Sequence, residues 1–195
     1  MKYSAIVLAG GKSSRMKRNK ALLPLGEKTF IGTIVDELKE YFDEVIVVTN
    51  KPEDYRFLDC GFTSDLFADM GPLGGIHAGL LYTKNKYAFV TACDMPFIDA
   101  QVALKLAGLA DGYDGAVPKK GKYLQPLFAA YSQDCLPAIE KCLIEDKKRI
   151  IAFYPYVKLL FPSWDELIEN ENVDKTFFNV NTPDDLRLLN DYQKK

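Results

Sequence analysis

Apolar residues occur along this chain in two kinds of pattern. Continuous apolar runs fill residues 3–9, 44–50 and 87–93, which is typical of strands buried on both faces of a sheet. Between the runs, the apolar residues of 29–42 recur with helical spacing, and a second helix is predicted over 74–83. Strands of this kind that alternate with helices predict an α/β fold with a mostly parallel sheet.

The C-terminal half has a less regular pattern. It predicts strands over 124–131 and 157–161, and helices over 134–144 and 183–193. No internal repeat, low-complexity tract or interdomain linker interrupts the sequence, and 195 residues are enough to bury one core. We therefore expect a single domain over residues 1–195.

Composition and charge exclude several functional classes. Lys and Arg total 25 while Asp and Glu total 27, so the net charge of −2 gives no overall footprint for nucleic acid. No apolar run approaches the roughly 18 residues of a membrane span, and the apolar N-terminal stretch is too short for a signal peptide. The cysteines show neither CxxC nor zinc-type spacing, so we expect buried free thiols at Cys60, Cys93, Cys135 and Cys142. These features predict a cytoplasmic protein that binds neither nucleic acid nor membrane.

The strongest local signal is the loop LAGGKSSRMKRNK at residues 8–20, which directly follows the first predicted strand. Gly10 and Gly11 let the backbone approach a ligand closely, and exposed N–H groups there can bind phosphate oxygens. The basic side chains that follow, with no acidic one among them, are Lys12, Arg15, Lys17, Arg18 and Lys20. The spacing matches neither a Walker A loop nor GxGxxG. Because α/β folds bind ligands at the carboxyl ends of their strands, we favour a polyphosphate site over a solvated basic loop.

A carboxylate is expected at the same edge of the sheet. Asp94 follows the apolar run of residues 87–93, as Gly10 follows the first run. A carboxylate that faces polyphosphate indicates Mg²⁺, which takes one or two protein carboxylates together with phosphate oxygens and waters. The alternative is an aspartate that caps the following turn.

Two further segments carry candidate ligand groups. Residues 71–79 (GPLGGIHAG) indicate a tight loop and a close helix approach, over a base or ribose or simply as a structural loop. Residues 177–185 (FFNVNTPDD) place Asn179 and Asn181 before the last predicted helix. Paired amides could grip a second substrate or ligate a metal, and their alternative role is turn and cap chemistry.

Together these motifs resemble a known family. LAGGKSSRM with Lys20, then GPLGGIHAGL, CDMPFI, QPLFAAY and FNVNTPDDL are similar to the molybdenum cofactor guanylyltransferases, from residue 4 to about residue 190. The resemblance implies a GT-A-like nucleotidyltransferase with a three-layer α/β/α, Rossmann-like fold. It also implies transfer of GMP from GTP to the terminal phosphate of molybdopterin, with Mg²⁺ present and pyrophosphate released.

The resemblance also implies roles for individual residues. Catalysis is assigned to Lys20 and Asp94, and Mg²⁺ to Asp94; Arg15 joins the catalytic residues because its positive charge would lower the repulsion between the two anionic substrates. The nucleotide contacts implied are Leu8, Ala9, Gly10, Gly11, Lys20, Asn50, Asp65 and Asp94. The pterin side is assigned to Asn179 and Asn181. This chain departs from the family pattern at Lys17 and Asn19, where glycine and aspartate are common.

Two other functions stay open at this point. The first is a cytidylyltransferase of the same fold, acting on molybdopterin or another small molecule. Gly10, where such relatives tend to have alanine, leaves more room beside the base and favours a purine. The second is a non-catalytic nucleotide-binding relative, against which the presence of Lys20 and Asp94 argues. Transient contacts with other cofactor-maturation proteins or with target molybdoenzymes are also expected.

Overall fold

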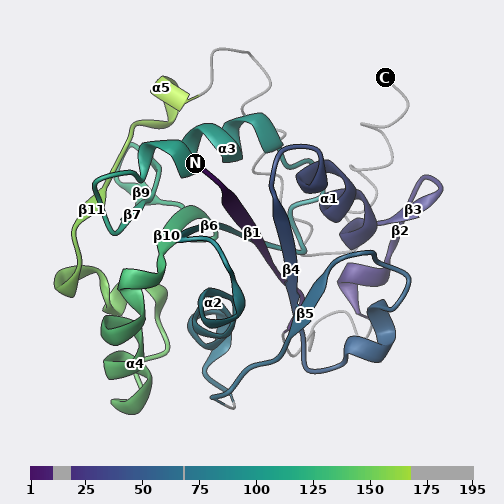
Figure 1. Cartoon of the computed structure of the whole chain (residues 1–195), viewed down its shortest axis with the longest axis horizontal. Coiled ribbons are helices and arrows are strands. Elements are labelled where there is room, and N and C mark those ends of the chain that lie inside the picture. The colour runs from purple at the N-terminus through teal and green to yellow at the C-terminus, as the bar shows by residue number, and fades with distance from the viewer. Residues whose placement is uncertain (11–18, 68, 168–195) are drawn as a thin grey trace.

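A central sheet organises the protein, whose computed structural model describes residues 1–10, 19–67 and 69–167. Among these residues, the sheet has the strand order β11-β7-β10-β6-β1-β4-β5 (Figure 1). Its strands are β1 (Tyr3–Leu8), β4 (Glu44–Val48), β5 (Gly61–Thr63), β6 (Tyr87–Ala92), β7 (Gly115–Ala116), β10 (Phe128–Ser132) and β11 (Leu159–Leu160). All of these strands run parallel except β10, which pairs antiparallel with both of its neighbours. The prediction of a mostly parallel sheet is therefore confirmed.

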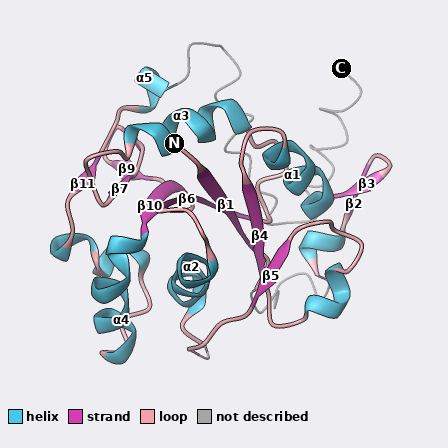
Figure 2. Ribbon diagram, viewed as in Figure 1, coloured by secondary structure: helices cyan, strands magenta, loops and turns pink. Residues whose placement is uncertain are grey.

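Helices cover both faces of the sheet and give three layers (Figure 2). One face packs against α1 (Phe30–Lys39), α3 (Ala100–Leu109) and the short α5 (Trp164–Leu167), and the other against α2 (Gly71–Tyr82) and α4 (Leu136–Ile144). Because strand side chains alternate, Ala5 and Val7 of β1 join the first core while Ile6 and Leu8 join the second. None of the described helices is long and apolar enough to cross a membrane.

Short elements complete the edges of the described fold. Two hairpins form from β2 (Pro24–Leu25) with β3 (Lys28–Thr29) and from β8 (Lys119–Lys120) with β9 (Tyr123–Leu124). The 3-10 turns are η1 (Lys20–Leu22), η2 (Pro52–Tyr55), η3 (Gln133–Cys135), η4 (Ile150–Ala152) and η5 (Tyr154–Tyr156).

The predicted elements of the first half are confirmed, with one helix missed. The strands expected in the three apolar runs are β1, β4 and β6, and the helix predicted over 74–83 already begins at Gly71 with proline in its first turn. The sequence pattern does not predict α3, whose alanine-rich face contrasts little with its neighbours. Its start is set by Asp99, whose carboxylate accepts from the backbone N–H groups of Gln101 and Val102, both at 3.0 Å.

The predictions for the second half need larger corrections. The strand predicted over 124–131 is wrong at its start, because Gln125 turns the chain and the strand begins at Phe128. The predicted helix over 134–144 is confirmed from Leu136, and the one over 183–193 lies outside the described residues. Of the four cysteines expected to be buried free thiols, all are free, but two of them, Cys60 and Cys93, are only half-buried.

Glycines let α2 press directly onto β1. A Cβ atom built on Gly79 would lie 2.7 Å from Cγ2 of Ile6, closer than real contacts allow, and one built on Gly75 would lie 3.0 Å from Cδ2 of Leu8. The helix backbone therefore rests on the side chains of the strand with no side chain of its own between them. This close packing brings the first turn of α2 to the carboxyl edge of the sheet.

The close packing predicts an unusual cost for a single methyl group. Gly79→Ala should destabilise the fold by about 1–3 kcal/mol, because Ile6 is fully buried and has little room to move. Urea unfolding measures the change. Gly108→Ala is the matched control on α3, where the nearest atom to the new methyl, the Tyr3 hydroxyl oxygen, is 3.8 Å away. The Gly108→Ala substitution should leave the free energy of unfolding unchanged or increase it, since alanine favours helix. If the two substitutions change the free energy of unfolding equally, the packing argument is wrong.

Candidate active site

Four parallel strands end at one edge of the sheet, and each is followed by a residue predicted to bind ligand. Gly10, Asn50, Asp65 and Asp94 come two residues after β1, β4, β5 and β6, respectively. The prediction that Gly10 and Asp94 share an edge is confirmed by the parallel pairing of β1 with β6. This edge is where α/β folds bind their ligands.

The end of β1 is held rigidly by its neighbours. The Ala9 N–H donates to the Val48 carbonyl at 2.9 Å, and the Cys93 N–H donates to the Leu8 carbonyl at 3.1 Å, so the ladder continues past the strand ends. A Cβ atom built on Gly10 would meet no described atom within 4 Å. Among the described residues, nothing therefore fills the space beside the Gly10 backbone.

Asp65 carries an unsatisfied oxygen into this edge. Its N–H donates to Oδ1 of Asn50 at 3.1 Å, while its own Oδ1 is buried and has no hydrogen-bond partner among the described residues. Burial raises the pKa of the Asp65 carboxyl, and a hydrogen bond with Asn50 partly offsets that rise. The carboxylate lies against α2, where a Cβ atom on Gly75 would be 3.6 Å from Oδ1. The Asp65 side chain as a whole is half-buried, so part of it remains exposed at this edge.

Lys20 and Asp94 lie near enough to each other at this edge for their charges to interact. Lys20 is the first residue of η1, and Asp94 lies in the turn after β6. Burial raises the pKa of the Asp94 carboxyl, and the positive charge of Lys20 acts in the opposite direction. The pair therefore combines a cation suited to phosphate with a half-buried carboxylate.

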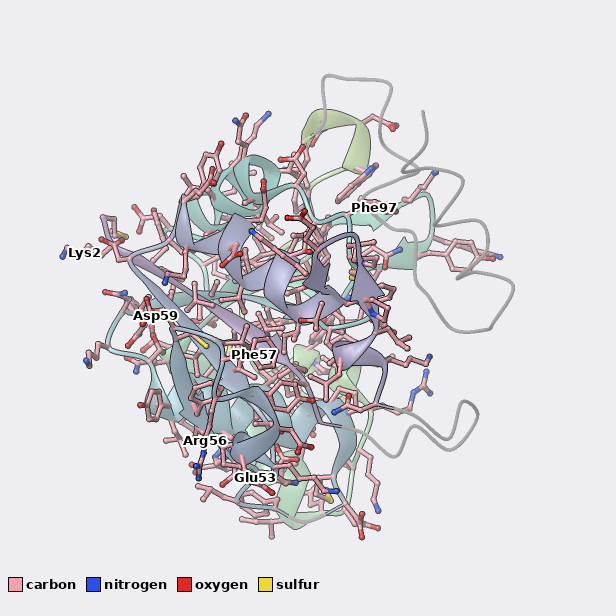
Figure 3. The ribbon with its side chains drawn as sticks, turned by 90° about the vertical axis from the view of Figure 1, so that its right-hand side faces the viewer. Lys2, Glu53, Arg56, Phe57, Asp59 and Phe97 are labelled. Atoms are coloured by element: carbon pink, nitrogen blue, oxygen red, sulfur yellow. The ribbon has the colours of Figure 1, made fainter. Side chains whose placement is uncertain are left out.

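A small apolar cluster holds the two segments together. Leu25 and Phe30 are buried next to the hairpin that follows Lys20, and Phe97, three residues after Asp94, packs against them. Figure 3 shows Phe97 among the side chains of this part of the molecule. The segment that follows Asp94 is thus anchored to the segment that follows Lys20.

An open pocket of about 350 Å³ lies beside the first turn of α2. It is lined by Pro72, Pro126, Lys148, Arg149, Ile150 and Ile151. Pro126 is held from the core by the buried Tyr131, whose hydroxyl donates to the Pro126 carbonyl at 3.0 Å and lies 2.7 Å from the Tyr154 hydroxyl. The lining combines apolar surface with two cations, which suits a ring that carries a phosphate. No motif of the sequence points to Lys148 and Arg149, because no recognisable spacing links them to Pro126.

The donor set at this edge fits Mg²⁺. Within the described parts of the chain, no three His, Cys, Asp or Glu side chains lie close enough to hold a metal by themselves. Mg²⁺ needs fewer protein ligands, since it keeps several waters and takes phosphate oxygens with one or two carboxylates. Asp94, half-buried beside Lys20, meets that requirement.

Several predicted positions cannot be compared with the structure. Gly11, Arg15, Lys17, Asn179 and Asn181 lie outside the described residues. Asp94 is confirmed at the edge, whereas Asp99 is a helix cap.

His77 has a place in the core. It is buried on α2, with Nε2 3.2 Å from Oε1 of Glu140 on α4 and its ring packed edge-on against Phe67. This position between two helices gives His77 a structural role in the packing of α2 against α4.

Comparison with known proteins agrees with the geometry. The family model of the MobA-like NTP transferase domain matches residues 5–157. A protein of Pelotomaculum thermopropionicum described as a probable molybdenum cofactor guanylyltransferase is 42% identical over 186 residues, covering 95% of this chain and 91% of its own.

Solved structures show the same fold. Molybdopterin-guanine dinucleotide biosynthesis protein A from Archaeoglobus fulgidus superposes with a TM-score of 0.85 at 25% identity, over 98% of both chains. The 4-diphosphocytidyl-2C-methyl-D-erythritol synthase of Anaerococcus prevotii shares the fold at a TM-score of 0.69 and 14% identity, over 100% of this chain and 99% of its own. Sequence and structure together establish that this chain belongs to the MobA-like NTP transferase family.

Proposed function

We propose that this protein is a molybdenum cofactor guanylyltransferase, which transfers GMP from GTP to the terminal phosphate of molybdopterin and releases pyrophosphate. The observation that carries the proposal is the placement of Asp94 just beyond β6 at the same carboxyl edge as Gly10 beyond β1, with the charge of Lys20 acting on that carboxylate. The similarity to a probable guanylyltransferase over 95% of the chain supports it. The fold alone does not select the base, because a cytidylyl-transferring neighbour shares it.

The nucleotide would lie over the ends of β1, β4 and β5. The open space at Gly10 leaves room for a purine. Guanine presents N–H donors on its Watson–Crick edge and ribose presents hydroxyls, and the half-buried carboxylate of Asp65 would accept from either. Asn50, bonded to the Asp65 backbone, would hold this carboxylate in place.

The second substrate would lie in the pocket beside α2. Pro72, Pro126 and the isoleucines offer apolar surface to a ring system, and Lys148 with Arg149 offers positive charge to a phosphate. The resemblance adds Asn179 and Asn181 to this side of the site.

The mechanism needs little proton transfer. The molybdopterin phosphate is ionised near neutral pH, so one of its oxygens can attack the α-phosphorus of GTP without a strong base. The bond from the α-phosphorus to the bridging oxygen breaks, and pyrophosphate leaves with the electron pair. Lys20, with Arg15, would lower the repulsion between the two anions and orient them. Bound at Asp94, Mg²⁺ would supply further charge neutralisation on the phosphates.

Partner proteins and cellular location are the remaining parts of the proposal. The family resemblance favours transient contacts with other cofactor-maturation proteins or with target molybdoenzymes, which would receive the product. We also propose a cytoplasmic location, with which the four free cysteines agree.

Base choice is the most direct test. Titration calorimetry at fixed Mg²⁺ should show tighter binding of GTP than of CTP, ATP or UTP, because the space beside Gly10 would admit a purine and Asp65 would accept from the N–H groups of guanine. A preference for CTP would assign the chain to the cytidylyltransferases instead.

The metal role of Asp94 predicts opposite effects on activity and stability. Asp94→Asn should lower turnover by at least about a hundredfold, because it removes the carboxylate that would hold Mg²⁺. The apo fold should be equally or more stable, since burial raises the pKa of this carboxyl and ionising it costs the folded state free energy. That cost grows as pH rises past the ordinary aspartate range, so the stability difference should be larger at pH 7 than at pH 4.

Turnover assays and thermal unfolding without metal measure the two effects. Asp99→Asn is the matched control, because asparagine also caps helices and α3 should form normally. Full turnover by Asp94→Asn would remove this residue from the metal role.

The pocket predicts a split between the two substrates. Arg149→Ala should raise KM for molybdopterin about tenfold and leave KM for GTP unchanged, because it removes a charge-assisted phosphate contact. Arg56→Ala, at an exposed arginine outside the pocket (Figure 3), is the control and should change neither. A rise in the KM for GTP alone would place the nucleotide in the pocket.

A further inference from the structure

A buried tyrosine lies behind the candidate site. Tyr55, the last residue of η2, is 1% exposed. Its hydroxyl accepts a hydrogen bond from Nδ2 of Asn19 at 2.8 Å and donates one to the Ala9 carbonyl at 3.3 Å. One hydroxyl group thus joins three segments of the site: the end of β1, the start of η1 and the turn after β4.

Asn19 transmits this contact to Lys20. While its Nδ2 donates to Tyr55, its Oδ1 accepts from the Ala21 N–H at 3.2 Å and caps η1. Its own carbonyl accepts from the Leu22 N–H at 3.2 Å. Lys20 follows Asn19 directly in the chain. The hydrogen bonds made by the side chain and by the carbonyl of Asn19 therefore fix the backbone that carries the lysine.

The other end of this link is the rigid edge of the sheet. The Ala9 N–H is bonded to Val48 of β4, and its carbonyl receives the tyrosine proton. These bonds therefore fix the position of Lys20 relative to β1. That strand pairs with β6, and Asp94 lies just beyond the end of β6.

The asparagine suits this arrangement better than the aspartate common in the family. A carboxylate only accepts, so aspartate would compete with Ala9 for the single hydroxyl proton of Tyr55. The amide donates to the tyrosine and accepts from Ala21 at once, which leaves that proton on Ala9. Burial also raises the pKa of Tyr55, so the hydroxyl stays protonated near neutral pH.

We propose that Tyr55 is a positioning residue for the nucleotidyl transfer, which acts through Asn19 to hold Lys20 at the GTP phosphates. The inference rests on the proposed phosphate-binding role of Lys20. Tyr55 itself need not touch a substrate, because its hydroxyl is already engaged on both sides.

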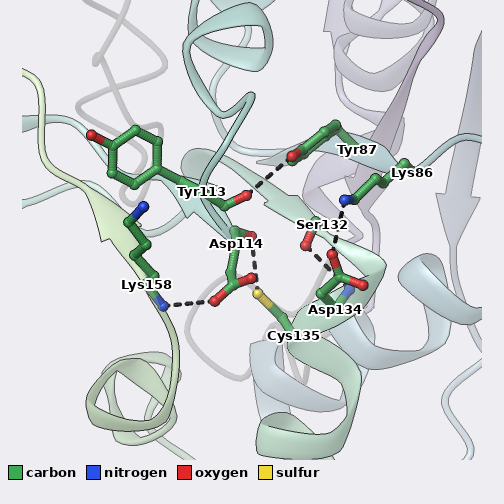
Figure 4. Close-up of polar contacts among 8 residues, drawn as sticks. All are labelled: Lys86, Tyr87, Tyr113, Asp114, Ser132, Asp134, Cys135 and Lys158. Carbon is green, nitrogen blue, oxygen red and sulfur yellow. Dashed lines mark hydrogen bonds and ion pairs between the residues drawn. The ribbon is translucent and has the colours of Figure 1, made fainter.

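A double-mutant cycle tests the link. We would measure GTP dissociation constants by calorimetry with Mg²⁺ for Tyr55→Phe, Lys20→Ala and the double variant. Asn19→Ser is a second way to cut the link, since serine still caps η1 but is too short to reach Tyr55. Tyr87→Phe is the matched control: Tyr87 is 2% exposed and donates to the Tyr113 carbonyl at 3.1 Å, at the amino end of β6 (Figure 4).

Tyr55→Phe and Asn19→Ser should each weaken GTP binding about three- to tenfold, while Tyr87→Phe leaves it unchanged. Adding Tyr55→Phe to Lys20→Ala should weaken binding no further, because the lysine that Tyr55 positions is gone. A merely structural loss would lower the melting temperature and add to the Lys20→Ala effect instead.

Two results would overturn the inference in distinguishable ways. If Lys20→Ala impairs GTP binding but Tyr55→Phe and Asn19→Ser bind like the unaltered protein, the positioning role is wrong and the proposed function stands. If Lys20→Ala itself binds GTP normally, the proposed role of the lysine fails, and the inference fails with it.

Discussion

The contact of α2 with β1 determines the geometry on which the candidate site depends. Gly79 and Gly75 bring the helix backbone onto Ile6 and Leu8. Larger residues would lift α2 away from the sheet and carry its first turn, with Pro72, out of line with the strand ends. Gly75 also leaves the space in which the Asp65 carboxylate lies against the helix. At Gly75, a core-packing requirement and a ligand-binding requirement are therefore met by one small residue.

Much of the site could be predicted because its residues lie directly after the strands in the sequence. Each apolar run ends at the sheet edge, and the polar residue just beyond it must appear there, which correctly places Gly10 and Asp94. The helix α3 was not predicted because alanines, which are only weakly apolar, make up most of its buried face. The true start of β10 at Phe128 was missed because the apolar letters on either side of Pro126 conceal a turn.

The parts that could not be predicted depend on contacts between distant residues. The pocket brings residue 72 together with 126 and 148–151, and the link from Asn19 through Tyr55 to Ala9 spans three separate segments. No spacing rule connects such positions, since their meeting is decided by strand order and helix packing. The charge of Lys20 near Asp94 is of the same kind: each residue is recognisable alone, but their proximity is a property of the fold.

The antiparallel direction of β10 affects how the substrate preference of such a protein can diversify. Because β10 runs antiparallel, its amino end lies at the edge where its parallel neighbours have their carboxyl ends, and the Pro126 turn reaches the substrate side there. The sheet is thereby divided at β6 into a half that would serve the nucleotide and a half that would serve the acceptor. Substitutions on the acceptor side would leave the β1–β4–β5 edge intact. The preference for the acceptor substrate could then change while binding of the nucleotide donor stays the same.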